Sequence, residues 1–137
     1  LARVGRGETK MSHSSDAMIA QVHDWMERFV TLMKVHDQIR WEIGDHMQQE
    51  AAMPEEVSQV FPASDKVLHT IRQYQECAAK YPECERHDEV RWNHHWMVRD
   101  REDRHDWLKL VAENDIGEYV LRDMLNQEKQ DDNRNAR

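Results

Sequence analysis

Mostly apolar residues recur at alternating steps of three and four between residues 22 and 46, and this pattern restricts the fold more than any other feature of the chain. Such spacing places the residues along one side of an α-helix, at the a and d positions of a heptad repeat. These positions, called the seam below, are Val22, Trp25, Phe29, Leu32, His36, Ile39, Ile43 and His46. We therefore expect one long helix, in which the seam spans about 36 Å at 1.5 Å per residue.

The ends of this helix are predicted by its flanking residues. Ser14-Ser15-Asp16 supplies an N-cap and an acidic first turn, and Pro54 stops the helix, which we place from about Ser15 to Ala52. Residues 1–14 precede the pattern, and we interpret them as a flexible leader or a cloning remnant. Gly44 is the one weak position inside the helix.

The rest of the chain also favours helix over sheet, because it has only four glycines and three prolines and little Val, Ile or Thr. We predict an all-α fold, an antiparallel bundle of about four helices, as a single domain over residues 15–128 with a polar tail over 129–137. The expected helices after the first lie at 53–61, 65–81, 82–112 and from the Asp115/Glu118 capping-box pattern onward. The charged segment 99–106 inside the third is either solvated on every face or bent.

Charge and cysteine content restrict the class of partner and the compartment. The formal net charge is −8, which disfavours broad phosphate binding and therefore nucleic acid, and suits a basic protein partner. No apolar run approaches the roughly 18 to 20 residues of a membrane span, so we expect no membrane contact. Two cysteines do not form a disulfide framework, and we expect a cytoplasmic protein.

The segment VHDQIRW, residues 35–41, returns almost unchanged as RHDEVRW, residues 86–92. His-Asp pairs also occur among the metal ligands of HD phosphohydrolases, but the resemblance ends at the dipeptide, and we do not assign the chain to that family. Three-residue spacing puts His and the apolar residue on one helix face, with Asp beside Arg. We interpret both segments as parts of ordinary helices, in which Asp37 and Asp88 are exposed and each pairs with the arginine three residues later on the same helix.

The most defined metal candidate is Cys77, Cys84 and His87, where a turn at Tyr81-Pro82 could bring two thiols together for zinc. A fourth ligand is not evident, and two buried thiols flanking a turn are the simpler interpretation. One Glu-x-x-His match, Glu102 to His105, does not complete a di-iron site. Haem ligation through His94, His95 or Met97 is a further alternative.

A helix-turn-helix is a third candidate, in the segment 107–125. Its second helix carries Glu118 and Asp123 against Arg122 alone, whereas a helix that enters a DNA groove is expected to be basic. A DNA-binding regulator is therefore the second alternative function, after a metal- or haem-binding helical bundle with redox or hydrolytic activity.

The functional prediction is an acidic protein-interaction module that acts as a homo-oligomer, an adaptor or inhibitor of the kind found in bacterial and phage genomes. The seam is longer than the other apolar patterns, so a second subunit is expected to cover it, most simply in a twofold dimer. Protonation of His36 and His46 in acid would then place charge in the interface and weaken it. Trp41, Trp92 and Trp96 lie partly off the apolar patterns and are further interface candidates, unless they complete a small core.

Overall fold

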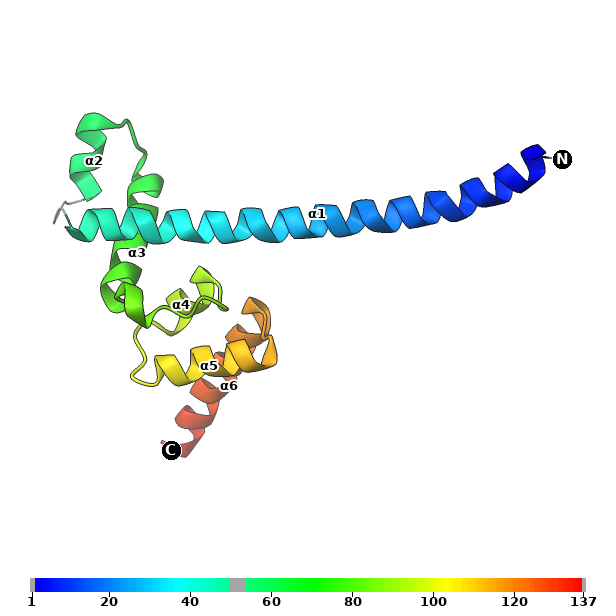
Figure 1. The fold of residues 1–137 in the computed structure, drawn as a ribbon. Coiled ribbons are helices and arrows are strands. Elements are labelled where there is room, and N and C mark those ends of the chain that lie inside the picture. Colours follow the sequence, from blue (N-terminus) through cyan, green and yellow to red (C-terminus); the bar gives the residue numbers. More distant parts are fainter. Residues whose placement is uncertain (1, 50–53, 137) are drawn as a thin grey trace. The chain divides into compact units, whose positions relative to one another are not determined.

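The described part of the chain is entirely helical. The computed structural model describes residues 2–49 and 54–136 (Figure 1). Six α-helices and one 3-10 turn, without a strand, make up these residues: α1 Ala2–Gln49, α2 Pro54–Val60, α3 Asp65–Lys80, η1 Glu83–Glu85, α4 Trp92–Val98, α5 Arg104–Asn114 and α6 Glu118–Asn135. The predicted all-α class and the long N-terminal helix are confirmed. The chain divides into two compact units, Leu1–His36 and Asp37–Arg137, which are described separately.

Several predicted helix ends are confirmed. α2 begins at Pro54, a residue whose fixed φ suits the first helical position. α3 begins after Ser64, whose hydroxyl oxygen accepts a hydrogen bond from the Val67 amide at 3.3 Å, as an N-cap should. The predicted start of the first helix at about Ser15, with an N-cap at Ser14-Ser15-Asp16, is wrong, because α1 is helical from Ala2 onward. The predicted end near Ala52 and the side chains of residues 1–14 lie outside the described residues, and the domain boundary at residue 14 stays a prediction.

The continuous helix predicted over 82–112 is wrong. This stretch forms η1, a loop over residues 86–91, α4, a turn near Asp100 and then α5. The turn lies inside the charged segment 99–106, so of the two alternatives for that segment the bend is confirmed. The loop at 86–91 holds the second echo segment, which is therefore not helical, and its two arginines reach across to α1 as described below.

The start of the last helix also differs from the prediction. Asp115 is not an N-cap but adopts the left-handed conformation (φ 49°) that ends α5, and Gly117 precedes α6 without a side-chain cap. The Glu118 carboxylate accepts hydrogen bonds from Asn93 instead of closing a capping box. α6 continues to Asn135, so the polar segment from Lys129 is helical in the structure.

The core of the second unit is built on aromatic rings. Its buried apolar residues are Trp41, Cys77, Tyr81, Val90, Trp92, Val98, Leu108, Val111 and Leu121. The Trp41 ring lies edge-on to Tyr81 and to Trp92 at centroid distances of 6.1 and 6.3 Å, a geometry that aromatic pairs prefer. Trp41 and Trp92 are therefore core residues, and the alternative in which tryptophans complete a small core holds for both.

Gly44 allows α1 and α3 to approach each other closely. A Cβ atom at this position would lie 2.3 Å from the carbonyl oxygen of Tyr74 and 2.9 Å from Cβ of Ala78. A backbone carbonyl inside a helix cannot turn aside as a flexible side chain would, so the contact requires glycine. Gly44 thus lowers the local helix propensity of α1, and its missing side chain lets α3 pack against α1.

Gly44→Ala should lower the free energy of unfolding by about 1–3 kcal/mol through overpacking, although alanine improves helix propensity by about 1 kcal/mol. Chemical denaturation followed by circular dichroism measures the change. Gly117→Ser is the control, because a Cβ there meets nothing within 4 Å and serine suits an N-cap. Unchanged or higher stability of Gly44→Ala would show that the helices do not approach as described.

Candidate interaction surface

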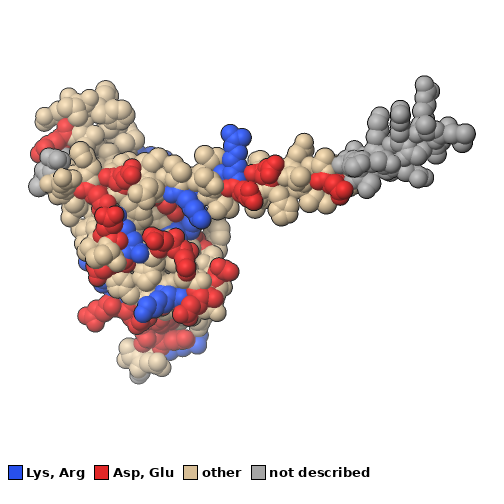
Figure 2. Space-filling view, in the orientation of Figure 1, with Lys and Arg blue, Asp and Glu red and all other residues tan. Residues whose placement is uncertain are grey.

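Apolar side chains of the first unit are exposed along α1. Nine large ones in the described residues are between 45% and 65% exposed and are called the stripe below: Met18, Ile19, Val22, Trp25, Met26, Phe29, Val30, Leu32 and Val35. The stripe includes the first four predicted seam residues. Figure 2 shows uncharged surface along this part of α1, with acidic and basic side chains between its patches. Contiguous exposed apolar patches of this kind mark interaction sites in proteins.

A hollow along the stripe has the form that receives a side chain from another helix. It is lined by Met18, Gln21, Val22 and Trp25, which are spaced i, i+3, i+4 and i+7. Four residues with this spacing form the hole that accepts a knob in helix–helix packing. The Trp25 ring stacks on Phe29, one turn on, with centroids 5.5 Å apart and planes at 8°. The hollow and the stacked rings share Trp25, so they form one continuous part of the stripe.

The core of the second unit takes one face of residues 37–49 of α1. Its buried residues in α1 are Asp37, Trp41, Gly44 and Met47. These occupy the b, f, b and e positions when the seam defines a and d. The seam itself stays outside this core: Ile39 is 47% exposed, His36 and His46 are exposed, and Ile43 is half-buried. The seam is therefore not used by the core of the second unit.

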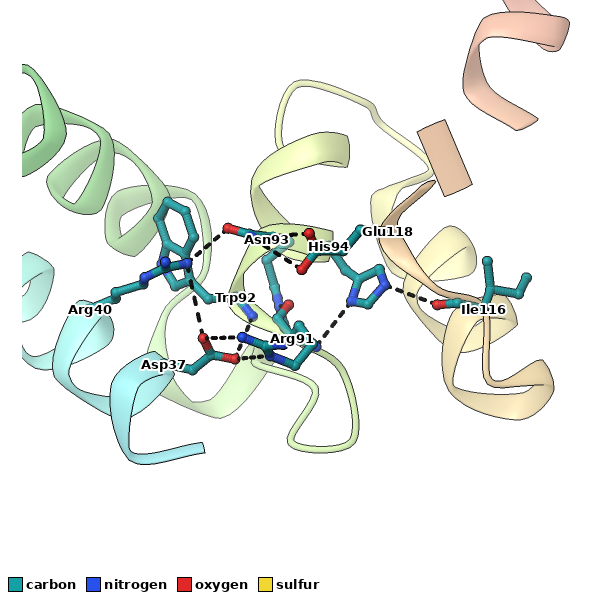
Figure 3. A network of polar contacts seen from close by, with 9 residues as sticks. Asp37, Arg40, Arg91, Trp92, Asn93, His94, Ile116 and Glu118 are labelled. Carbon is teal, nitrogen blue, oxygen red and sulfur yellow. Dashed lines mark hydrogen bonds and ion pairs between the residues drawn. The ribbon is translucent and has the colours of Figure 1, made fainter. Parts of the chain in front are cut away.

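Asp37 is the polar centre of the second unit (Figure 3). Its carboxylate accepts hydrogen bonds from Arg91 Nε at 2.7 Å, from the second Arg91 nitrogen at 3.2 Å and from the Trp92 amide at 3.2 Å. Burial would raise the pKa of Asp37, but these hydrogen bonds outweigh it and hold the pKa below its usual value. The Trp92 amide is the first backbone amide of α4. The N-cap residue of this helix, Arg91, has no side-chain acceptor for the amides of the first turn, so the Asp37 carboxylate from α1 serves as one.

Arg40 extends this network to α6. Its guanidinium donates to Oδ1 of Asn93 at 2.8 Å and lies 5.1 Å from the centroid of Trp92. The Asn93 amide in turn donates to both carboxylate oxygens of Glu118, at 3.0 and 3.1 Å. Side chains from α1, α4 and α6 are thus linked in one chain of hydrogen bonds (Figure 3).

A second aspartate of α1 holds the other end of the 86–91 loop. Arg86 donates to both carboxylate oxygens of Asp45, at 2.9 and 2.5 Å, and its guanidinium lies 4.2 Å from the ring centroid of Trp41. Together with Asp37–Arg91, this pair ties both arginines of the second echo segment to α1. Arginine and carboxylate form such paired hydrogen bonds because their geometries match. These two pairs hold both ends of the segment against α1, and between them the chain makes a turn, in which the Val90 amide donates to the carbonyl oxygen of His87 at 3.1 Å.

Two buried histidines are held in the neutral state. His94 accepts from the Arg91 amide through Nδ1 at 3.1 Å, and its Nε2 lies 2.9 Å from the carbonyl oxygen of Ile116. His95 accepts from the His87 amide through Nε2 at 3.1 Å, and its Nδ1 lies 2.8 Å from the Arg91 carbonyl oxygen. In each ring one nitrogen must accept and the other donate. Burial lowers the pKa of His94, and lowers that of His95 to about 4.

Within the described residues, the candidate metal ligands do not come together. Cys77 is fully buried in α3 with its pKa raised to about 12 by burial, whereas Cys84 is exposed in η1. His87 instead contacts His105, with 3.0 Å between ring nitrogens. No group of three or more metal-ligating side chains is found in the described residues. His94 and His95 use both ring nitrogens in hydrogen bonds, which leaves neither for haem.

The predicted helix-turn-helix segment does form two helices, α5 and α6, joined by residues 115–117. The first turns of α6 present Glu118 to Asn93 and leave Arg122 and Asp123 exposed. Two acidic residues stand against one basic residue at the start of this helix, whereas a helix that enters a DNA groove is expected to be basic.

Comparisons with protein-family models, with curated proteins and with solved structures find no match to this chain. Within the described residues, no helix has an apolar stretch long enough to cross a lipid bilayer.

The periodicity of the sequence predicted the positions of the seam, but it did not predict the polar network around Asp37. The echo segments were visible as a repeat, yet we interpreted Asp37 as an exposed intrahelical partner of Arg40. Asp37 is in fact buried, and Arg40 lies 4.0 Å away while Arg91 takes the shorter contacts. The only sequence signal was that Asp37, Trp41 and Gly44 recur at steps of four and three, on a second face of the helix.

The earlier expectation of a small effect at Asp37 is therefore replaced. Asp37→Asn should lower the free energy of unfolding by about 1–3 kcal/mol, because it removes the charge that pairs with Arg91 and keeps only part of the hydrogen bonding. Asp88→Asn is the matched control from the second echo segment. Asp88 is exposed, so its replacement should change stability by less than about 0.5 kcal/mol. Equal effects in denaturant titrations would contradict the role given to Asp37.

Acid should destabilise the second unit before its carboxylates titrate. Above about pH 6.5 folded and unfolded His95 are both neutral, so stability does not depend on this group. Between that pH and the folded-state pKa of about 4, His95 is protonated in the unfolded state but stays neutral in the folded state. The free energy of unfolding therefore falls as the pH falls through this range. Each unit of pH in this window should remove up to about 1.4 kcal/mol per buried histidine.

Denaturation midpoints at pH 7.5, 6.5, 5.5 and 4.5, at one protein concentration, measure this dependence. His69→Gln, at an exposed position of α3, should leave the slope unchanged. His95→Gln should lower stability at pH 7.5 and flatten the slope. A parent chain equally stable at pH 7.5 and 5 would show that His95 accepts its proton without cost.

Proposed function

We propose that this protein is a helical protein-interaction module that binds through the α1 stripe and assembles with copies of itself. The observation that carries the proposal is the exposure of nine large apolar side chains along one helix. An amphipathic helix acquires most of its stability from burial of its apolar face, so a helix with this face uncovered is incomplete alone. An antiparallel helical bundle, predicted from the sequence, would then be completed between chains.

The stripe has the size of a protein interface. Nine large side chains that are each about half exposed offer an apolar area of the same order as the roughly 800 Å² that one partner buries in a stable complex. The stripe contains Trp25 and Phe29, and aromatic residues dominate the energetic centres of interfaces. The position of these rings near the middle of the stripe supports an interface centred there.

The remaining surface supports an adaptor or inhibitor more than an enzyme. Acidic side chains are frequent on the face of the second unit that Figure 2 shows, which suits a basic protein partner once the module has assembled. Cys77 and Cys84 are free thiols, and an exposed free thiol such as Cys84 is compatible with the reducing cytoplasm that we propose as the compartment.

Val22→Glu should dissociate the assembly, because it places a carboxylate at the centre of the apolar face. We expect the apparent dissociation constant to rise at least about tenfold, equivalent to about 1.4 kcal/mol. Sedimentation velocity over a concentration series measures it. Ala20→Glu adds the same charge two residues away, at the f position opposite the seam, and should leave association unchanged. A parent chain that is monomeric at high micromolar concentration would refute self-association.

A further inference from the structure

The stripe is wider than a two-stranded coiled coil requires. With the seam at a and d, Ile19, Met26 and Met33 occupy three successive e positions. Successive helical residues are rotated by about 100°, so a, d and e residues together form an apolar face about 100° wide. A two-stranded coil needs only a and d, whereas an apolar a, d and e pattern is typical of helices with more than one neighbour.

Two of the three e positions are exposed to a similar degree as the seam. Ile19 is 59% exposed and Met26 47%, against 61% for Val22 on the seam itself, and Met33 is half-buried. In a two-stranded coil these residues would stay at the rim, in contact with water. Two-stranded coils usually carry charged residues at e, where they form salt bridges with the partner helix. The first unit has no charge at these three positions.

The opposite face of the same helix carries no large apolar side chain at its f positions. These are Ala20, Glu27 and Lys34, which would face solvent in any assembly built on the stripe. Few charges interrupt the stripe, so copies of it can pack without repulsion between like charges. The hollow lined by Met18, Gln21, Val22 and Trp25 has the spacing that receives a side chain of another helix, and α1 of a second copy carries such side chains at the required repeat.

We infer that α1 takes a helix on each of its two flanks, so that the assembly is a bundle of at least three α1 helices from as many copies of the chain. One neighbour covers the a and d residues, and the next covers the e residues and closes the apolar core. This inference rests on the proposed self-association and specifies its form.

Native mass spectrometry and light scattering of the full chain at pH 7.5 count the subunits directly. Three or more are expected. A dimer that does not grow with concentration would overturn the bundle and leave the proposed interaction function intact. A monomer would overturn both, and a stripe covered by another part of the same chain would give that result.

A set of glutamine substitutions tests which flank is involved. The variant with Ile19→Gln, Met26→Gln and Met33→Gln should have fewer subunits than the parent, because the e flank no longer excludes water. The control with Ala20→Gln, Glu27→Gln and Lys34→Gln makes the same number of changes at f and should keep the parent's subunit number. Circular dichroism shows whether either variant loses helix. Equal subunit numbers in the two variants would contradict a neighbour on the e flank.

Discussion

The second unit depends on one buried carboxylate. Asp37, in the last third of α1, accepts a hydrogen bond from the first amide of α4, which has no acceptor within its own segment, and it pairs with Arg91 in the same contact. A helix of seven residues has little stability of its own, so its position is set by such contacts and by the packing of Trp92. Through Arg40 and Asn93 the same network reaches the first residue of α6. The short helices are therefore ordered by α1.

α1 contacts the core of the second unit mainly through residues at its b and f positions. The seam, at positions a and d, is therefore not used by this core. Trp41 and Gly44 face the core, and Gly44 lets α3 approach. Ile39 lies among these residues in sequence but on the other face of the helix, and it is half exposed. α1 thus carries apolar side chains in two settings. Those in the second unit complete a small core, whereas those of the stripe in the first unit are exposed, and we propose that they bind another helix.

Periodicity predicted what depends on local sequence. The long helix, the proline start of α2 and the Ser64 cap follow from residues within a few positions of each other, and the structure agrees. The helix predicted over 82–112 failed because its conformation is decided by distant partners: Arg86 and Arg91 pair with Asp45 and Asp37 of α1. Nothing near the loop signals those pairs. Distant contacts also decide where Cys77, Cys84 and His87 lie. The three residues are close in sequence, but Cys77 is buried, Cys84 is exposed and His87 contacts His105.

The central claim is that the stripe is covered by other copies of the chain while the second unit is complete by itself. Hydrogen–deuterium exchange at two protein concentrations, above and below the association midpoint, tests this directly. Amides of residues 18–35 should exchange slowly when the protein is assembled and fast after dilution, whereas amides of α4 and α5 should be equally protected at both concentrations. Protection of residues 18–35 that is independent of concentration would contradict the account.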